Sequence, residues 1–152
     1  HRPEEPIMNL SPNFTLEELT WSDTAQRLRL DNRPDARITS HLVALAAGLE
    51  QIRTLLGNRP MRINSGYRSP ALNRAIGGAR TSAHLDGYAA DFVCPAYGTP
   101  KDIAQALARS NLSFDQVIQE GTWVHVSFAP AARRQLLTAR FTPAGTTYFM
   151  GI

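Results

Sequence analysis

Two histidines and an aspartate lie in segments whose other residues are mostly small or apolar. His84 lies in a loop at residues 81–88, Asp91 in the strand-like run that follows, and His125 in a second strand-like run at residues 123–128. A buried carboxylate without a partner is costly, so Asp91 needs a cation beside it. Two imidazoles and a carboxylate supply three ligands of a tetrahedral zinc and leave the fourth position to water, as catalytic zinc sites require. We therefore predict one zinc ion bound by His84, Asp91 and His125.

Strand alternation supports this ligand set, because successive side chains of a strand point to opposite faces. Ala89 shares a face with Asp91, and its small side chain leaves room for an ion beside the carboxylate. In the second run the aliphatic and phenyl side chains occupy one face, and His125 shares the other with Trp123 and Ser127. Each strand is thus expected to present its ligand on the face opposite its core residues.

The turn between the two last strand-like runs decides which acidic residue serves as the base. A two-residue turn at residues 121–122, which Gly121 in its first position allows, places Ile118 opposite His125. Glu120 then lies diagonally from His125 on the same face. A diagonal spacing of roughly 7–8 Å lets a carboxylate reach a water on the metal but not the metal itself. Glu120 is therefore the candidate general base.

A three-residue turn is the alternative, and it would reverse the faces of one strand. Gln119 and Asp115 would then lie on the histidine face, whereas the two-residue turn points Asp115 away from it. The choice of base depends on the turn length.

Helix signals dominate the first half of the chain. Thr15 followed by Glu18 forms a capping box that starts a short helix. Between Pro34 and Gly57, apolar residues recur at three- and four-residue steps and predict a long helix. Further helices are predicted at residues 70–76, 99–110 and 129–137, the last of them before a tail that contains glycine and threonine.

Strand signals cluster later in the chain. Strands are predicted at residues 61–64 and 88–94, followed by an antiparallel hairpin whose two runs meet at residues 120–122. Helices first and strands later favour an α+β fold, with helices packed on a small, mainly antiparallel sheet, over a doubly wound one.

Length and composition limit the classes of protein. The 152 residues, 43% hydrophobic and 19% charged, suit one globular domain, which we place at residues 13–152 after a flexible tail at residues 1–12. The net charge is +3 and the arginines are scattered, so we expect no nucleic-acid partner; no apolar run is long enough for membrane insertion. Cys94 is the only cysteine and is read as a small buried side chain; His41 is expected at the surface of the long helix.

Several motifs together resemble one known family. They are Ser65-Gly66-Tyr67-Arg68-Ser69, then Asn73 and Gly77, then the pattern Ser-x-His-x-x-Gly-x-Ala-x-Asp over residues 82–91, and Trp-Val-His-Val at residues 123–126. The combination, from about residue 13 to residue 128, resembles the zinc D-Ala-D-Ala carboxypeptidases (peptidase family M15), especially the small single-domain members of bacteriophages and prophages. The resemblance implies a hedgehog-like α+β fold with zinc bound by His84, Asp91 and His125.

The resemblance also implies roles for further residues. Arg68 corresponds to the family arginine that faces the substrate and helps to polarise the scissile carbonyl. Ser82 either binds substrate or orients the His84 loop. The family's acidic residue often stands three positions before the last histidine, where this chain has Thr122. Glu120, five positions before His125, is expected to replace it.

The activity implied is that of a zinc-dependent peptidase acting on peptidoglycan stem peptides, as a D-Ala-D-Ala carboxypeptidase or an endopeptidase. Such an enzyme acts at the bacterial cell wall, outside the cytoplasmic membrane. The sequence starts without an apolar export segment, which favours a phage or prophage endolysin released at lysis. We also expect the protein to be a monomer.

Two other classes share part of this pattern. Non-haem iron oxygenases also use two histidines and a carboxylate, but they are rich in strands, whereas this chain predicts at least three helices. A non-catalytic module with a zinc site, for cell-wall binding or for a phage particle, would explain Thr122 at the usual acidic position.

Overall fold

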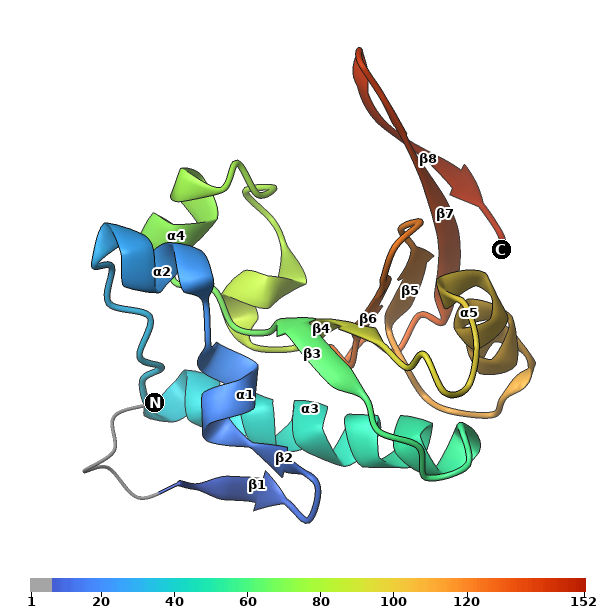
Figure 1. The fold of residues 1–152 in the computed structure, drawn as a ribbon, viewed down its shortest axis with the longest axis horizontal. Helices are drawn as coiled ribbons and strands as arrows, with labels where there is room; N and C mark the ends of the chain where they lie inside the picture. Colours follow the sequence, from blue (N-terminus) through green and yellow to red (C-terminus); the bar gives the residue numbers. More distant parts are fainter. Residues whose placement is uncertain (1–6) are drawn as a thin grey trace.

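The computed structural model describes residues 7–152, which form an α+β fold (Figure 1). The helices are α1 (Leu16–Thr20), α2 (Asp23–Leu28), α3 (Ala36–Leu55), α4 (Pro70–Ala75), the short 3-10 helix η1 (Ala83–Asp86) and α5 (Pro100–Arg109). The strands are β1 (Asn9–Ser11), β2 (Phe14–Thr15), β3 (Arg62–Ser65), β4 (Ala89–Val93), β5 (Gln116–Gln119), β6 (Val124–Ser127), β7 (Gln135–Thr142) and β8 (Gly145–Met150). No described helix is long and apolar enough to cross a membrane.

The larger sheet has six strands in the order β3-β4-β6-β5-β7-β8. Neighbouring strands run antiparallel except for β5 and β7, which are parallel. Strands β1 and β2 form a separate two-stranded sheet. The mainly antiparallel arrangement predicted from the sequence is therefore confirmed.

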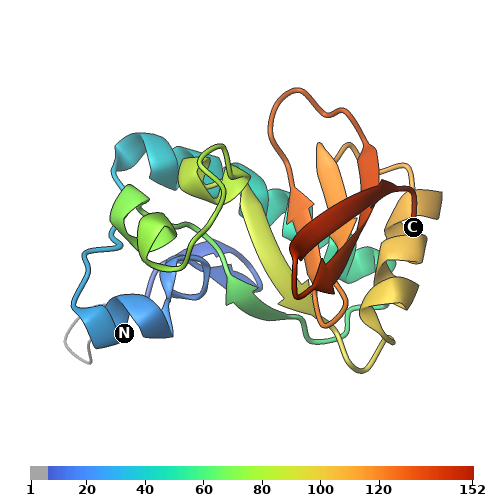
Figure 2. The same cartoon turned by 90° about the horizontal axis from the view of Figure 1, so that it is seen from above.

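The core lies between α3, α5 and one face of the sheet. The apolar stripe of α3 is fully buried and shares one cluster with the inward side chains of β4, β6 and α5 (Ile38, Leu42, Leu45, Leu49, Ile52, Ala90, Phe92, Val124, Val126, Ile103, Leu107). Figures 1 and 2 show α3 behind the sheet, with α1, α2 and α4 gathered at one end and α5 at the other. The opposite face of the sheet does not pack against this core.

Local signals in the first half of the chain gave the expected elements. Thr15 and Glu18 form both hydrogen bonds of the capping box at the start of α1, and α3 occupies the predicted long segment. The helices α4 and α5 lie where they were predicted. The short helices α2 and η1 were not predicted, because six and four residues are too few for a periodic pattern.

The predicted helix at residues 129–137 is wrong. That segment is a loop in which Ala132 and Arg134 have positive φ angles of 48° and 54°, and β7 begins at Gln135. The predicted tail is also wrong, since it contains β8, which pairs with β7. Parallel pairing of β7 with β5 supplies backbone hydrogen bonds that override the local preference of alanine, arginine and leucine for helix.

The fold begins earlier than the predicted boundary at residue 13. Asn9–Ser11 forms β1, and the turn after it is tied to α3 by Glu50, which accepts hydrogen bonds from Ser11 Oγ (2.6 Å) and the Asn13 amide (2.7 Å). The part of the predicted tail at residues 1–6 lies outside the described residues.

Candidate active site

Three predicted ligands come together on the open face of the sheet. His84 lies on η1, while Asp91 in β4 and His125 in β6 stand directly opposite each other across an antiparallel pair. Asp91 Oδ1 is 3.1 Å from His84 Nε2 and 3.0 Å from His125 Nδ1. One donor atom from each residue lies within 4.8 Å of the other two, and all three residues are buried.

The hydrogen bonding of His84 suits a cation at this point. Its Nδ1 is 2.7 Å from the carbonyl oxygen of Gly66, which can only accept, so Nδ1 carries the proton. In the neutral ring Nε2 is then a lone pair, and it faces the carboxylate of Asp91. Two acceptors at 3.1 Å repel each other unless a positive charge lies with them. The donor set thus fits a single zinc with one open position.

The electrostatic surroundings of His84 and Asp91 suit metal binding. Burial lowers the pKa of His84 and outweighs the opposing effect of Asp91, so the imidazole is kept neutral. Burial acts to raise the pKa of Asp91, yet that pKa lies well below its usual range, so the carboxylate is ionised. A neutral imidazole and an ionised carboxylate are the forms that ligate a metal.

The turn after β5 has two residues, as the first alternative predicted. Ile118 stands opposite His125, the Glu120 amide donates to the Trp123 carbonyl (3.0 Å), and Gly121 adopts a φ of 83°. The Glu120 carboxylate accepts a hydrogen bond from the indole Nε1 of Trp123. Glu120 therefore lies on the histidine face of the sheet.

The three-residue turn, the second alternative, is not formed. Asp115 is buried and paired with Arg133, whose guanidinium donates to both of its carboxylate oxygens at 2.9 Å. This ion pair anchors the loop that leads into β7, and it leaves Glu120 as the acidic residue beside the three ligands.

Glu120 has the electrostatic surroundings of a proton carrier. Burial raises its pKa, and the negative charge of Asp91 raises it further, against smaller opposing effects of His125, Trp123 and Arg68. A glutamate with a raised pKa takes and returns a proton more readily near neutral pH.

Arg68 approaches the ligands from the β3 side. Its amide donates to the carbonyl of His84 (3.1 Å), and its Nη1 donates to Asn73 Oδ1 (2.9 Å). Burial lowers the pKa of Arg68, while Asp91 and Glu120 both act to raise it, so the guanidinium lies within electrostatic range of both carboxylates. The buried Nε of Arg68 has no hydrogen-bond partner among the described residues. A buried donor without a partner is rare in folded proteins and marks this guanidinium as unusual.

Ser82 caps the helix that carries His84, since its Oγ accepts from the His84 amide at 3.2 Å. That is the orienting role of the two predicted for Ser82, and its contact with substrate stays a prediction. Sequence reasoning missed the supporting residues Gly66, Asn73 and Trp123, which contact His84, Arg68 and Glu120 respectively. They lay within the quoted motifs, but only the tertiary structure shows which side chain each one holds.

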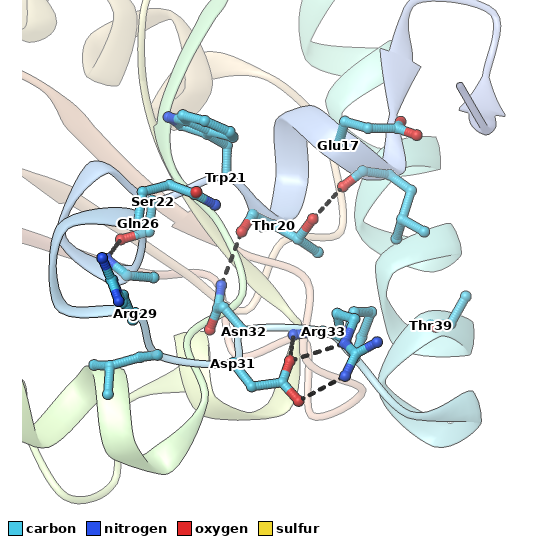
Figure 3. Close-up of a pocket in the computed structure, with 14 residues that line it drawn as sticks. Glu17, Thr20, Trp21, Ser22, Gln26, Arg29, Asp31, Asn32, Arg33 and Thr39 are labelled. Atoms are coloured by element: carbon cyan, nitrogen blue, oxygen red, sulfur yellow. Dashed lines mark hydrogen bonds and ion pairs between the residues drawn. The ribbon is translucent and has the colours of Figure 1, made fainter. Parts of the chain in front are cut away.

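Two hollows lie on the helical side of the site. A pocket of about 710 Å³ lies between α1, α2, the loop at residues 29–34 and the start of α3, with Trp21, Asn32 and the ion pair of Asp31 and Arg33 along it (Figure 3). It includes none of the three ligands. A smaller hollow of about 260 Å³ is lined by Ser65 and Arg68 among others, and it adjoins the site because Ser65 is paired with Asp91.

A buried His-Asp-His group beside a carboxylate, on an α+β fold, is the arrangement expected of a zinc metallopeptidase. In agreement, residues 12–127 match the family described as Peptidase M15, and the chain belongs to that family. It is also similar to the zinc D-Ala-D-Ala carboxypeptidase of Streptomyces albus G, with 34% identity over 73 residues, or 48% of this chain. The match covers 28% of that relative's length.

Proposed function

We propose that this protein hydrolyses the stem peptides of bacterial peptidoglycan, with zinc held by His84, Asp91 and His125. The observation that carries the proposal is the convergence of these three donors between a guanidinium and a carboxylate. In sheet order Arg68 follows β3, the ligands lie on or beside β4 and β6, and Glu120 follows β5. Similarity to a D-Ala-D-Ala carboxypeptidase supports the substrate class.

Each residue then has one task in the hydrolysis of an amide. Zinc held by His84, Asp91 and His125 would lower the pKa of a bound water toward about 7 and would polarise a carbonyl. As the water oxygen adds to the carbonyl carbon, the carboxylate of Glu120 takes the proton that the water loses. The positive charge of the Arg68 guanidinium, within electrostatic range of Asp91 and Glu120, stabilises the negative charge that develops on the carbonyl oxygen. Glu120 returns the proton to the amine as the carbon–nitrogen bond breaks.

These roles orient the substrate along the sheet. The leaving amine must lie on the β5 side, within reach of Glu120. The acyl part must then lie on the β3 side, where the smaller hollow beside Ser65 and Arg68 can receive it. The extended chain of a peptide thus crosses the ends of β4 and β6 between the two.

The proposed site of action is the bacterial cell wall, where this substrate occurs. Both a carboxypeptidase, which releases terminal D-alanine, and an endopeptidase of the stem peptide use this chemistry. The phage origin and the monomeric state stay predictions from the sequence.

Digestion of purified peptidoglycan tests the proposal. We expect the zinc-loaded protein to release fragments that mass spectrometry identifies as products of peptide-bond cleavage, and we expect Glu120→Gln to release them at least about 100-fold more slowly. Binding to peptidoglycan without any zinc-dependent cleavage would overturn the proposal and favour the non-catalytic module instead.

A further inference from the structure

One row of paired residues runs across the whole six-stranded sheet. Asp91 pairs with His125, His125 with Ile118, Ile118 with Leu137, and Leu137 with Met150. Paired residues point to the same face of a sheet. The face that carries the metal ligands therefore continues over β7 and β8, the C-terminal hairpin, which lies beyond the family match at residues 12–127.

The next row along the sheet brings the hairpin to Glu120. The register of β5 and β7, carried one residue past Gln119 and Thr138, aligns Glu120 with Ala139, and Ala139 pairs with Tyr148. Ala139 is small and buried, so it adds little bulk between the glutamate and the tyrosine. The charge of Glu120 acts, after burial, to raise the pKa of Tyr148, which shows that the phenol lies within electrostatic range of that carboxylate.

A second aromatic ring joins Tyr148 on this face. Phe141, two residues after Ala139, lies 6.2 Å from Trp123 between ring centroids, and Trp123 is the residue that donates to Glu120. Phe141 and Tyr148 remain 57% and 54% exposed. Figure 1 shows the hairpin projecting past the other strands of the sheet. We call these three rings, Trp123, Phe141 and Tyr148, the aromatic wall.

The position of the wall identifies the part of the substrate that it contacts. Glu120 protonates the leaving amine in the proposed reaction, so the residues that follow the scissile bond must pass beside Glu120. Those residues then lie against Phe141 and Tyr148. Aromatic side chains bind apolar and extended peptide surface well, because they bury much area with few rotatable bonds.

The charge of the hairpin face that carries Phe141 and Tyr148, here called the wall face, bears on the leaving group. A single released amino acid has a free carboxylate beside the scissile bond, whereas a longer peptide does not. Strand alternation gives this face of the hairpin Ala139, Phe141, Thr146 and Tyr148, none of them basic. Arg140 points to the opposite face, where its guanidinium lies over the ring of Phe149 at 4.7 Å. The described part of the hairpin thus offers no cation on the wall face for the free carboxylate of a single released amino acid.

We propose that the aromatic wall binds the chain on the leaving-group side of the scissile bond, and that the enzyme is an endopeptidase rather than a carboxypeptidase. This inference rests on the proposed function and chooses between its two forms. Phe141 and Tyr148 are specificity-determining residues in this account, and Glu120 remains the proton carrier.

Two substrates test the specificity. They are the stem pentapeptide ending in D-Ala-D-Ala with a free carboxylate, and the same peptide with that carboxylate amidated, both incubated with the zinc-loaded protein and followed by mass spectrometry. We expect cleavage of an internal bond at rates within about threefold for the two peptides, since 0.6–0.7 kcal/mol covers that factor. Release of terminal D-alanine from the free acid, with loss of cleavage in the amide, would overturn the inference but support the proposed function. No zinc-dependent cleavage of either peptide, or of whole peptidoglycan, would overturn both.

Variants of the hairpin test the wall itself. We expect Phe141→Ala and Tyr148→Ala each to raise KM for the cleaved peptide about tenfold, with kcat changed much less, because each removes apolar contact with substrate. Phe149→Ala is the matched control, since it removes an exposed ring from the other face of the same hairpin. Equal effects of all three substitutions, or a fall in kcat with unchanged KM, would overturn the role of the wall. Circular dichroism and bound zinc would confirm that the variants are folded.

Discussion

Glu120 and Trp123 face each other across a two-residue turn, and the indole N–H of Trp123 donates to the Glu120 carboxylate. Strand pairing on one side of the turn places Ile118 opposite His125. A carboxylate is therefore held beside the metal ligands from a position five residues before His125, although Thr122 occupies the position at which the family often carries its acid.

Replacing Glu120 with glutamine should abolish the proton transfer and keep the shape of the side chain. We expect kcat to fall by about 10²–10⁴, the usual contribution of a general acid or base, with zinc content unchanged. Peptide hydrolysis and metal analysis on the same sample measure both. Thr122→Ala is the control, and we expect activity close to that of the wild type. An equal fall in kcat in Glu120→Gln and Thr122→Ala would contradict the assignment of Glu120 as the general base.

Arg68→Lys keeps the positive charge but loses the planar group whose Nη1 binds Asn73. We expect kcat to fall by about 10- to 100-fold, because a donor to the developing oxyanion is misplaced, while bound zinc stays the same. Arg74→Lys, an exposed change in α4, is the matched control. Unchanged kcat in Arg68→Lys would show that this arginine only ties its loop to His84 and Asn73.

The acid limb of the pH profile should reflect Glu120. The carboxylate must start ionised to accept a proton, and burial together with the charge of Asp91 raises its pKa. Activity should therefore be lost at a higher pH than an exposed glutamate would allow, as pH falls through that raised pKa. We expect kcat/KM to fall as pH decreases along this acid limb, with bound zinc measured at each pH to separate protonation of Glu120 from metal loss. A profile still rising below about pH 5 would contradict this assignment.

Gly66 is required by space rather than by backbone conformation. A Cβ at this position would lie 2.2 Å from the carbonyl oxygen of Leu19, a backbone atom that cannot move aside. Gly66 also supplies the carbonyl that holds His84. We expect Gly66→Ala to lower the free energy of unfolding by about 1–3 kcal/mol in urea titrations, and to weaken zinc binding as well. Unchanged stability and zinc affinity would show that α1 can retreat without disturbing the site.

Local patterns were sufficient to predict several of the elements around the site. The capping box at Thr15, the apolar spacing of α3 and the glycine at position 121 each act within a few residues, and each gave the expected structure. The turn length then placed Glu120, because strand register follows from the turn.

Non-local pairing explains what the sequence did not reveal. Residues 135–137 read Gln-Leu-Leu after two arginines, which favours helix, yet parallel pairing with β5 makes them strand. The hairpin did carry a local signal, since Pro143, Ala144 and Gly145 separate two runs rich in threonine and aromatic residues. The contacts of Gly66 with His84 and of Asn73 with Arg68 join separate elements or loops, and no local pattern encodes them.

Titration of the metal-free protein with zinc tests the central claim most directly. Hydrolysis of peptidoglycan stem peptides should be absent without metal, rise in proportion to added zinc and level off at one equivalent per chain, as a single site of His84, Asp91 and His125 requires. Full hydrolysis by the metal-free protein, or restoration by iron and not by zinc, would contradict the account.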